Sequence, residues 1–168
     1  SGRDWFENYF RAGESRSYNF QTEGAIDTIK AFIKVVGRSD LSGAFEIYEN
    51  ETLLGLINYD AINTNSSSTY DLKGDIQNKL FKFLANGAKT RISLKLPVLS
   101  GYDVLIGYLD KIVLTYASNL VLHNDFMLFS NPLLKEDTIT YQVISDKEIE
   151  VWDITNHLVE SLPLQSIG

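Results

Sequence analysis

Hydrophobic and polar residues alternate along much of this chain. The segments 29–36, 91–96, 111–116 and 138–143 place apolar residues at every second position. Alternation with a period of two gives a β-strand one face for the core and one for solvent. Shorter runs of similar character predict further strands at 17–21, 44–48, 52–57, 79–85, 125–129 and 147–152. The pattern therefore predicts about ten short strands.

Turn-forming residues separate these segments. Asn50-Glu51 joins two of them, Asn86-Gly87 is a signal for a type I′ hairpin turn, and Ser145-Asp146 precedes the last strong segment. The polar segment 63–69 predicts an exposed loop. The nearest approach to a helical pattern, at 71–79, is weakened by a glycine.

Many short antiparallel strands with turns at this spacing are typical of two packed sheets. We therefore predict an all-β fold, an antiparallel two-sheet β-sandwich of the jelly-roll type. The prediction treats residues 1–168 as a single domain. A chain of 168 residues can bury a sizeable core without disulfides or metals.

Composition excludes several kinds of chemistry. The absence of cysteine removes disulfides, thiolate metal sites and cysteine nucleophiles. The formal charge is −7, and the basic residues are scattered singly, which argues against nucleic-acid binding. No apolar run is long enough for a membrane helix, so direct membrane insertion is not expected. The chain begins at Ser1-Gly2 without methionine and ends in a strand-like segment, so we expect a piece of a larger exported protein.

No pattern in the sequence indicates an active site. The two histidines, His123 and His157, each stand alone, and neither a Gly-x-Ser-x-Gly nor a phosphate-binding motif occurs. Two groups of carboxylates are predicted to lie on solvated faces, Glu46, Glu49 and Glu51 near the middle and Asp146, Glu148, Glu150 and Asp153 near the end. We expect no catalytic residue, no cofactor and no metal.

Aromatic residues make up 12% of the chain, which leaves carbohydrate binding open as an alternative. Tyr116 and Tyr141 fall on the apolar positions of their segments, and Phe81 and Phe83 lie in a hydrophobic run. These rings are therefore predicted to be core residues.

Three segments, in this order, resemble the region ahead of the peptidase domain in PorU-like proteins, the gingipain-related sortases of the type IX secretion system of Bacteroidetes. They are Gly2-Arg3-Asp4-Trp5-Phe6-Glu7-Asn8-Tyr9-Phe10, the run from Tyr108-Leu109-Asp110 to Thr115-Tyr116, and Val151-Trp152-Asp153-Ile154-Thr155-Asn156. The chain departs from the family pattern before Glu7, where a glycine is missing, and at Asn156-His157, where the family often has Asp-Pro.

The resemblance implies that the parent protein is a cysteine peptidase acting as a cell-surface sortase. This chain would then be an extracellular, outer-membrane-associated accessory domain without activity of its own. Its partners would be the downstream peptidase domain of the same polypeptide, secreted cargo or other secretion components. The residues that carry the family motif, each with an expected structural role, are Gly2, Trp5, Glu7, Phe10, Asp110, Trp152 and Asp153.

These residues also have physical interpretations. Trp5, Phe6 and Phe10 are expected to close one edge of the sandwich, and Asp110 is expected to begin a strand and bind a neighbouring loop. Two other functions remain open. A jelly-roll carbohydrate-binding module would expose two or three aromatic rings on one sheet face, and a hydrolase would need two carboxyls converging in a pocket.

Overall fold

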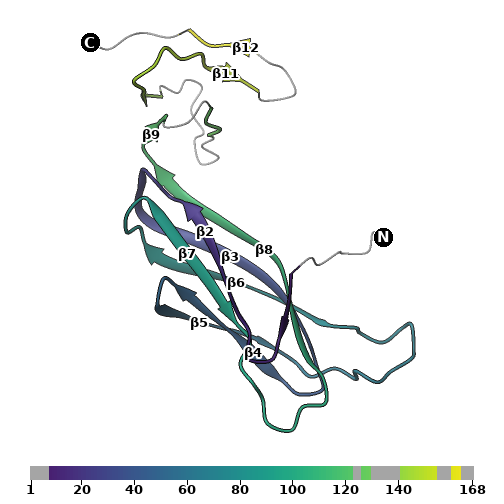
Figure 1. Cartoon of the computed structure of the whole chain (residues 1–168). Coiled ribbons are helices and arrows are strands. Elements are labelled where there is room, and N and C mark those ends of the chain that lie inside the picture. The colour runs from purple at the N-terminus through teal and green to yellow at the C-terminus, as the bar shows by residue number, and fades with distance from the viewer. Residues whose placement is uncertain (1–7, 123–125, 130–140, 155–159, 164–168) are drawn as a thin grey trace. The chain divides into compact units, whose positions relative to one another are not determined.

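The structure is a computed structural model, and it describes residues 8–122, 126–129, 141–154 and 160–163 (Figure 1). The chain divides into two compact units, Ser1–Ser118 and Asn119–Gly168, and each is described by itself. In the described part of the chain, no helix has the length and apolar character needed to cross a membrane.

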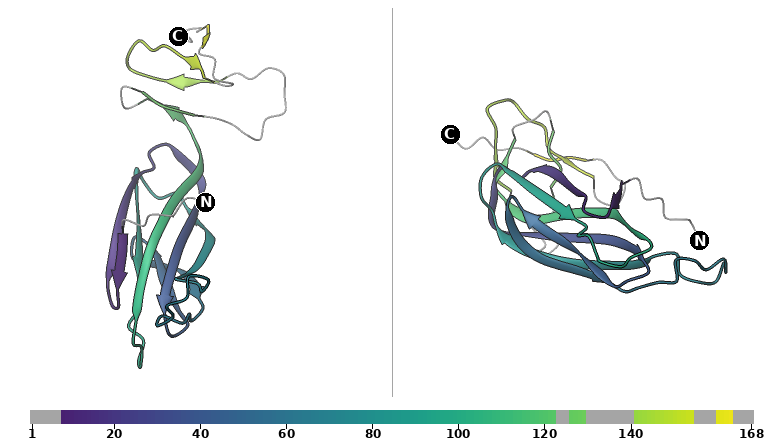
Figure 2. Two further views of the ribbon diagram at one scale, coloured as in Figure 1. Left: turned by 90° about the vertical axis from the view of Figure 1, so that its right-hand side faces the viewer. Right: turned by 60° about the horizontal axis from the view of Figure 1, so that its bottom comes forward.

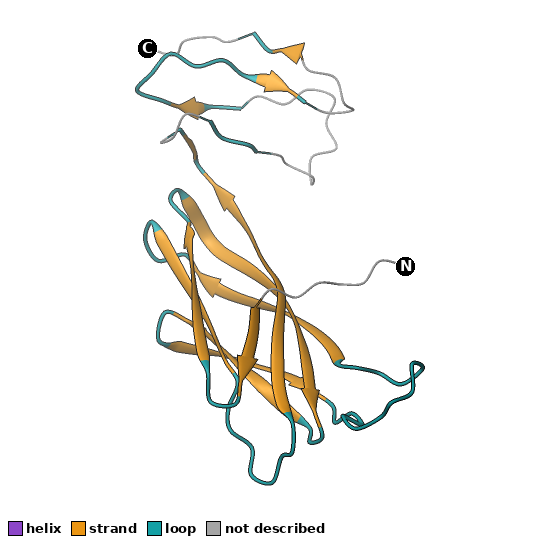
Figure 3. Ribbon diagram, turned by 45° about the vertical axis from the view of Figure 1, so that its right-hand side comes forward, coloured by secondary structure: helices purple, strands orange, loops and turns teal. Residues whose placement is uncertain are grey.

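The first unit contains eight strands, and Figure 3 shows that its described elements are strands joined by loops. Their order along the chain is β1 (Asn8–Arg11), β2 (Ser15–Gln21), β3 (Ala25–Ser39), β4 (Gly43–Glu49), β5 (Thr52–Tyr59), β6 (Asp75–Leu84), β7 (Lys89–Lys95) and β8 (Leu105–Ser118).

These strands form two four-stranded antiparallel sheets, in the orders β1-β8-β3-β6 and β2-β7-β4-β5 (Figures 1 and 2). The first strand pairs with the eighth, the second with the seventh, the third with the sixth and the fourth with the fifth. Nested pairing of this kind, alternating between two sheets, is the jelly-roll topology. The predicted all-β jelly-roll sandwich is confirmed.

The core lies between the two sheets and is built from the inward-facing residues of both. The Phe45 ring packs edge-to-face against Phe10 at 5.6 Å and against Tyr59 at 6.0 Å. Gly107 lies directly against the tip of the Phe45 ring, where a Cβ atom would overlap it. A glycine at this position is therefore required by the close approach of the β8 backbone to the aromatic core.

Most of the strands predicted before residue 118 are present, but one turn has a different role. Asn50-Glu51 joins β4 to β5 in a hairpin, with Asn50 in the left-handed conformation at φ 51°. Asn86-Gly87 instead connects β6 to β7, which belong to different sheets, and only Gly87 of the two has a positive φ. The type I′ hairpin prediction is therefore wrong, because that turn needs a positive φ at both residues and two paired strands.

The second unit contains two short strand pairs in its described residues. β9 (Leu120–Val121) pairs in parallel with β10 (Val143–Ile144), and β11 (Trp152–Asp153) pairs antiparallel with β12 (Glu160–Ser161). None of its described residues with an assigned burial is fully buried.

The strand predictions for the second unit are largely wrong. Residues 126–129 form no strand, and the segments predicted at 138–143 and 147–152 contribute only Val143 and Trp152 to strands among their described residues. All eight strands of the sandwich lie within the first unit. The grouping of residues 1–168 into one domain stays a prediction.

Candidate docking face

The outer face of the sheet β1-β8-β3-β6 is formed by side chains that alternate with buried residues. On β3 and β6 these are the even-numbered residues of 30–38 and 76–84. On β8 they are residues 106, 108, 110, 111, 113 and 115, and on β1 they are Tyr9 and Arg11. We call this set the basic face.

Asp110 lies at a β-bulge in the middle of this face. Lys34 pairs with Lys111 and the next residue of β3, Val35, pairs with Leu109, so Asp110 has no residue opposite it. The Asp110 carboxylate binds the Lys34 ammonium, with Oδ2 and Nζ 2.8 Å apart. β8 begins at Leu105, so Asp110 does not begin a strand as expected, and its charged partner is a strand residue. The extra residue shifts the inward-facing positions from odd to even numbers.

Apolar side chains form two rows across the basic face. Val113, Phe32 and Leu80 lie opposite one another on three neighbouring strands. Val113 is 44% exposed and Leu80 is 50% exposed. The second row contains Tyr9, Tyr108, Val36 and Ile76, of which Tyr9 and Ile76 are exposed and Val36 is buried. Several exposed apolar side chains on one sheet face are typical of an interaction surface.

The charges of the basic face are strongly one-sided. Six side chains are basic and one, Asp110, is acidic; the basic residues are Arg11, Lys30, Lys34, Arg38, Lys82 and Lys111. These basic residues are scattered along the sequence, but antiparallel strand pairing brings them together on one surface.

Two pairs of lysines lie directly opposite each other on this face, Lys30 with Lys82 and Lys34 with Lys111. Like charges in directly opposed positions destabilise a sheet. Asp110 offsets one pair through its contact with Lys34, and the Lys111 ammonium lies 5.7 Å from the centre of the Phe32 ring.

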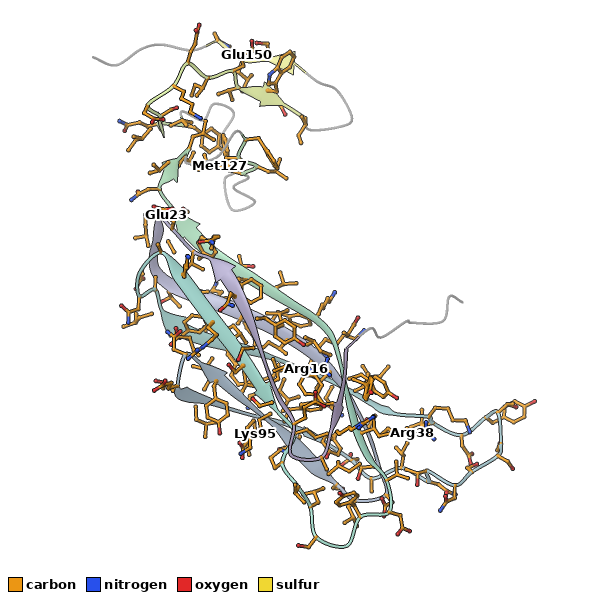
Figure 4. The ribbon with its side chains drawn as sticks, in the orientation of Figure 1. Arg16, Glu23, Arg38, Lys95, Met127 and Glu150 are labelled. Carbon is orange, nitrogen blue, oxygen red and sulfur yellow. The ribbon has the colours of Figure 1, made fainter. Side chains whose placement is uncertain are left out.

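The outer face of the sheet β2-β7-β4-β5, which we call the polar face, is arranged differently. Here Glu46 and Lys95, which lie directly opposite each other, have opposite charges, with Oε2 and Nζ 3.2 Å apart. The Tyr48 hydroxyl donates a second hydrogen bond to Glu46 at 2.7 Å. These contacts, that of Tyr48 first, hold the pKa of Glu46 below its usual range. Lys95 of the polar face and Arg38 of the basic face are labelled in Figure 4.

One polar hollow of about 590 Å³ lies at an end of the β2-β7-β4-β5 sheet. Its lining consists of amide, hydroxyl and charged side chains, without an aromatic ring: Asn19, Glu49, Asn50, Glu51, Thr52, Asn86, Lys89, Thr90 and Arg91. The carbohydrate-binding alternative expects exposed rings on a sheet face. Tyr48 is the aromatic residue on the described part of the polar face, and its hydroxyl is already bonded to Glu46.

The residues of the family motif are distributed over the two units. Phe10 is fully buried in the sandwich core, with the Arg16 guanidinium 5.3 Å from its ring centre. Gly2, Trp5 and Glu7 lie outside the described residues. In the second unit, Trp152 is half-exposed and lines an apolar hollow of about 580 Å³. Asp153 pairs with Glu160 across the β11–β12 ladder.

The other candidate groups form no metal-binding cluster in the described part of the chain. Within residues 8–122, 126–129, 141–154 and 160–163, no three His, Cys, Asp or Glu side chains are grouped so that they could hold a metal ion. His123 and His157 lie outside these residues, and Glu148 and Glu150 are exposed. Phe81 is a core residue as predicted, whereas Tyr141 is 40% exposed and packs edge-to-face against Phe129.

Comparison with solved structures identifies the same fold in another protein. The chain matches a segment of dimeric latent PorU from Porphyromonas gingivalis with a TM-score of 0.55. The two are 17% identical, and the match covers 73% of this chain and 12% of the PorU chain. The likeness to PorU is one of fold.

Two further solved structures show weaker similarity. One is the carbohydrate-binding module CBM36 in complex with calcium and xylotriose, with a TM-score of 0.44, 14% identity, and coverage of 64% of this chain and 78% of that chain. The other is the insecticidal δ-endotoxin Cry8Ea1 from Bacillus thuringiensis, with a TM-score of 0.46, 12% identity, and coverage of 66% and 19%. No protein-family model and no curated protein sequence matches the chain.

Proposed function

We propose that this chain is a non-catalytic accessory domain of a PorU-like cell-surface sortase, and that its basic face docks on the peptidase part of the same polypeptide. The proposed relation to PorU-like proteins is supported by the jelly-roll fold that this chain shares with a segment of PorU. The motif residues quoted above support the placement ahead of a peptidase. The parent protein would be exported and would act at the outer surface of the cell.

The observation that carries the proposal is the combination of opposed lysines and exposed apolar rows on one sheet face. Lys30 and Lys82 repel each other in the free domain, and this cost is offset when an acidic surface covers them. The rows through Val113 and Ile76 lose contact with water in the same step. The partner surface is therefore acidic with apolar patches.

A protein surface fits this face better than a nucleic acid. A phosphate backbone would pair with the lysines but would leave Val113, Leu80 and Ile76 exposed, each of which is at least 44% accessible in the free domain. Binding of duplex DNA or RNA that competes with the peptidase part would contradict the proposal.

The test measures binding of the isolated chain to the remainder of the same protein by calorimetry. V113D places a carboxylate in the middle of the basic face, and we expect it to weaken binding at least about tenfold. The matched control is L56D, because Leu56 is 42% exposed on the polar face and Val113 is 44% exposed. We expect L56D to change binding less than about twofold.

Equal effects of V113D and L56D would show that the basic face is not the docking site. A gene in which no peptidase region with a Cys–His pair follows residue 168 would contradict the sortase assignment itself. The carbohydrate-binding alternative predicts instead that a glycan raises the thermal unfolding temperature and that substitutions of Asn19 or Arg91 in the polar hollow abolish the increase.

A further inference from the structure

Strand β6, labelled in Figure 1, forms a long edge of the β1-β8-β3-β6 sheet. All ten of its residues pair with β3 in one unbroken register, from Asp75 opposite Gly37 to Leu84 opposite Thr28. In the described part of the chain, no strand pairs with its other side. An edge strand of this kind presents backbone donors and acceptors that can pair with another strand.

The three other edges of the sandwich are less suited to pairing. β1 has four residues, and β2 presents the polar side chains of Ser15, Ser17, Asn19 and Gln21 on its outer face. The register of β5 is interrupted opposite Ile47 and Tyr48, and Gly55 there has a φ of +146°. β6 therefore combines length, regular geometry and an apolar outer face.

The side chains of β6 repeat along the strand. Ile76, Leu80 and Leu84 are 48%, 50% and 69% exposed, and they are separated by Asn78 and Lys82. Lysine on an edge strand often prevents pairing. Here Lys79 is directed toward its own sandwich, since its ammonium donates to the Leu56 carbonyl at 3.0 Å and lies 5.4 Å from the centre of the Phe81 ring.

We propose that two copies of this chain associate through β6, paired antiparallel about a twofold axis at Leu80. In this register Leu80 lies opposite Leu80, and Ile76 lies opposite Leu84 at each end. Asn78 lies opposite Lys82 on both sides of the centre. Apolar residues thus face apolar residues, and no two lysines face each other.

Neighbouring registers are less favourable. A shift by one residue would place outer side chains opposite inner ones. A shift by two in one direction places Lys79 opposite Lys79 and Leu80 opposite Asn78. A shift by two in the other direction places Leu80 opposite Lys82 and Asn78 opposite Leu84. The sequence of β6 therefore selects one self-complementary register.

The pairing would join two sheets into one continuous eight-stranded sheet, with the basic faces of both copies on the same side. It uses the edge of the sheet, whereas the proposed docking uses its face. This inference does not depend on the proposed function, and its test needs only the isolated chain.

The first experiment introduces a negative or a positive charge at position 78 and measures the dimer dissociation constant by sedimentation. N78E places a carboxylate opposite Lys82 of the second copy at two positions, and N78K places an ammonium there. We expect N78E to tighten the dimer and N78K to weaken it, each by about 2- to 30-fold. The control is N58K, because Asn58 is also exposed on an edge strand but lies on β5, opposite Ala44.

The second experiment tests the register by disulfide formation. The chain has no cysteine, so L80C introduces a single thiol that would lie opposite itself across the twofold axis. We expect mild oxidation to cross-link L80C much faster than N58C. A wild-type chain that remains monomeric at all concentrations, a shift of the same sign for N78E and N78K, or equal cross-linking of L80C and N58C would overturn the proposal.

Discussion

The two outer faces of this sandwich arrange their charges in opposite ways. On the polar face, Glu46 lies across from Lys95 and also accepts a hydrogen bond from Tyr48. On the basic face, Lys30 lies across from Lys82. The polar face therefore has an ion pair between directly opposed residues, whereas the basic face has two residues of like charge in directly opposed positions. This difference is the reason why we propose the basic face, and not the polar face, as the docking surface.

The uncharged groups differ only in part, because the polar face also exposes Leu53 and Leu56. The hydroxyls of Ser17 and Ser93 bond to each other at 2.8 Å on the polar face. At the centre of the basic face, Val113 and Leu80 flank the half-buried Phe32 and remain exposed. Each directly opposed pair contributes about 0.2–1 kcal/mol to a sheet, so neither face dominates folding. Stability comes mainly from the core that the faces share.

The largest predicted effect therefore comes from the core beneath both faces. In G107A the new methyl group overlaps the tip of the Phe45 ring, which is already held by Phe10 and Tyr59. We expect a loss of about 1–3 kcal/mol in the free energy of unfolding. Urea denaturation, monitored by far-UV circular dichroism, measures this loss.

The Phe45 ring itself provides the control for that prediction. F45L removes the ring tip that the new methyl group would meet. The G107A substitution should therefore cost clearly less in an F45L background than in the wild type. Equal costs in the two backgrounds would show that the ring contact is not the reason for the glycine.

The fold was more predictable from the sequence than the docking face. Alternation over 29–36 and 91–96 identified central strands of both sheets, because one buried side leaves a period of two in the sequence. The hairpin predicted at Asn86-Gly87 was wrong because a local turn signal does not specify which sheet the next strand joins. The phase change between Leu109 and Ile112 could have revealed the bulge at Asp110.

The basic face could not be found by reading along the chain. Lys30, Lys82 and Lys111 are separated by tens of residues, and none of them lies next to another basic residue in the sequence. They become neighbours only through the pairing of β3 with β6 and β8. That pairing depends on the order of the strands in the sheet, and the alternation within a single strand does not reveal which strands are its neighbours. In the second unit, the described residues lack the buried side that makes alternation informative.

The next prediction uses one substitution on each face and expects opposite signs. K82E converts the Lys30–Lys82 pair to opposite charges, and we expect it to raise the free energy of unfolding by about 0.2–1 kcal/mol. K95E converts the Glu46–Lys95 pair to like charges, and we expect a decrease of similar size, about 0.2–1 kcal/mol. Urea denaturation at low ionic strength measures both changes.

For docking, the expected order is reversed: K82E, which should stabilise the fold, should impair binding, and K95E, which should destabilise the fold, should not. K82E should weaken binding to the peptidase part severalfold and reduce its dependence on salt, while K95E should leave binding unchanged. Destabilisation by K82E would show that Lys30 and Lys82 do not repel each other in the free domain. Stronger docking of K82E would show that the partner surface is not acidic.

The smallest predicted effect is the pH dependence that Glu46 of the polar face contributes to stability. The pKa of Glu46 is lowered in the folded state, chiefly by the Tyr48 hydroxyl and then by Lys95. Its contribution to stability is therefore fully present above the usual glutamate pKa of about 4.3, and it is lost as the pH falls through the lowered value.

E46Q should be less stable than the wild type at neutral pH by about 0.5 kcal/mol. This difference should shrink as the pH falls through the lowered pKa of Glu46. S17A removes the Ser17–Ser93 bond without removing a titrating group, so its deficit should stay constant over the same range. A deficit of E46Q that persists unchanged in acid would mean that the charge of Glu46 contributes nothing to the polar face.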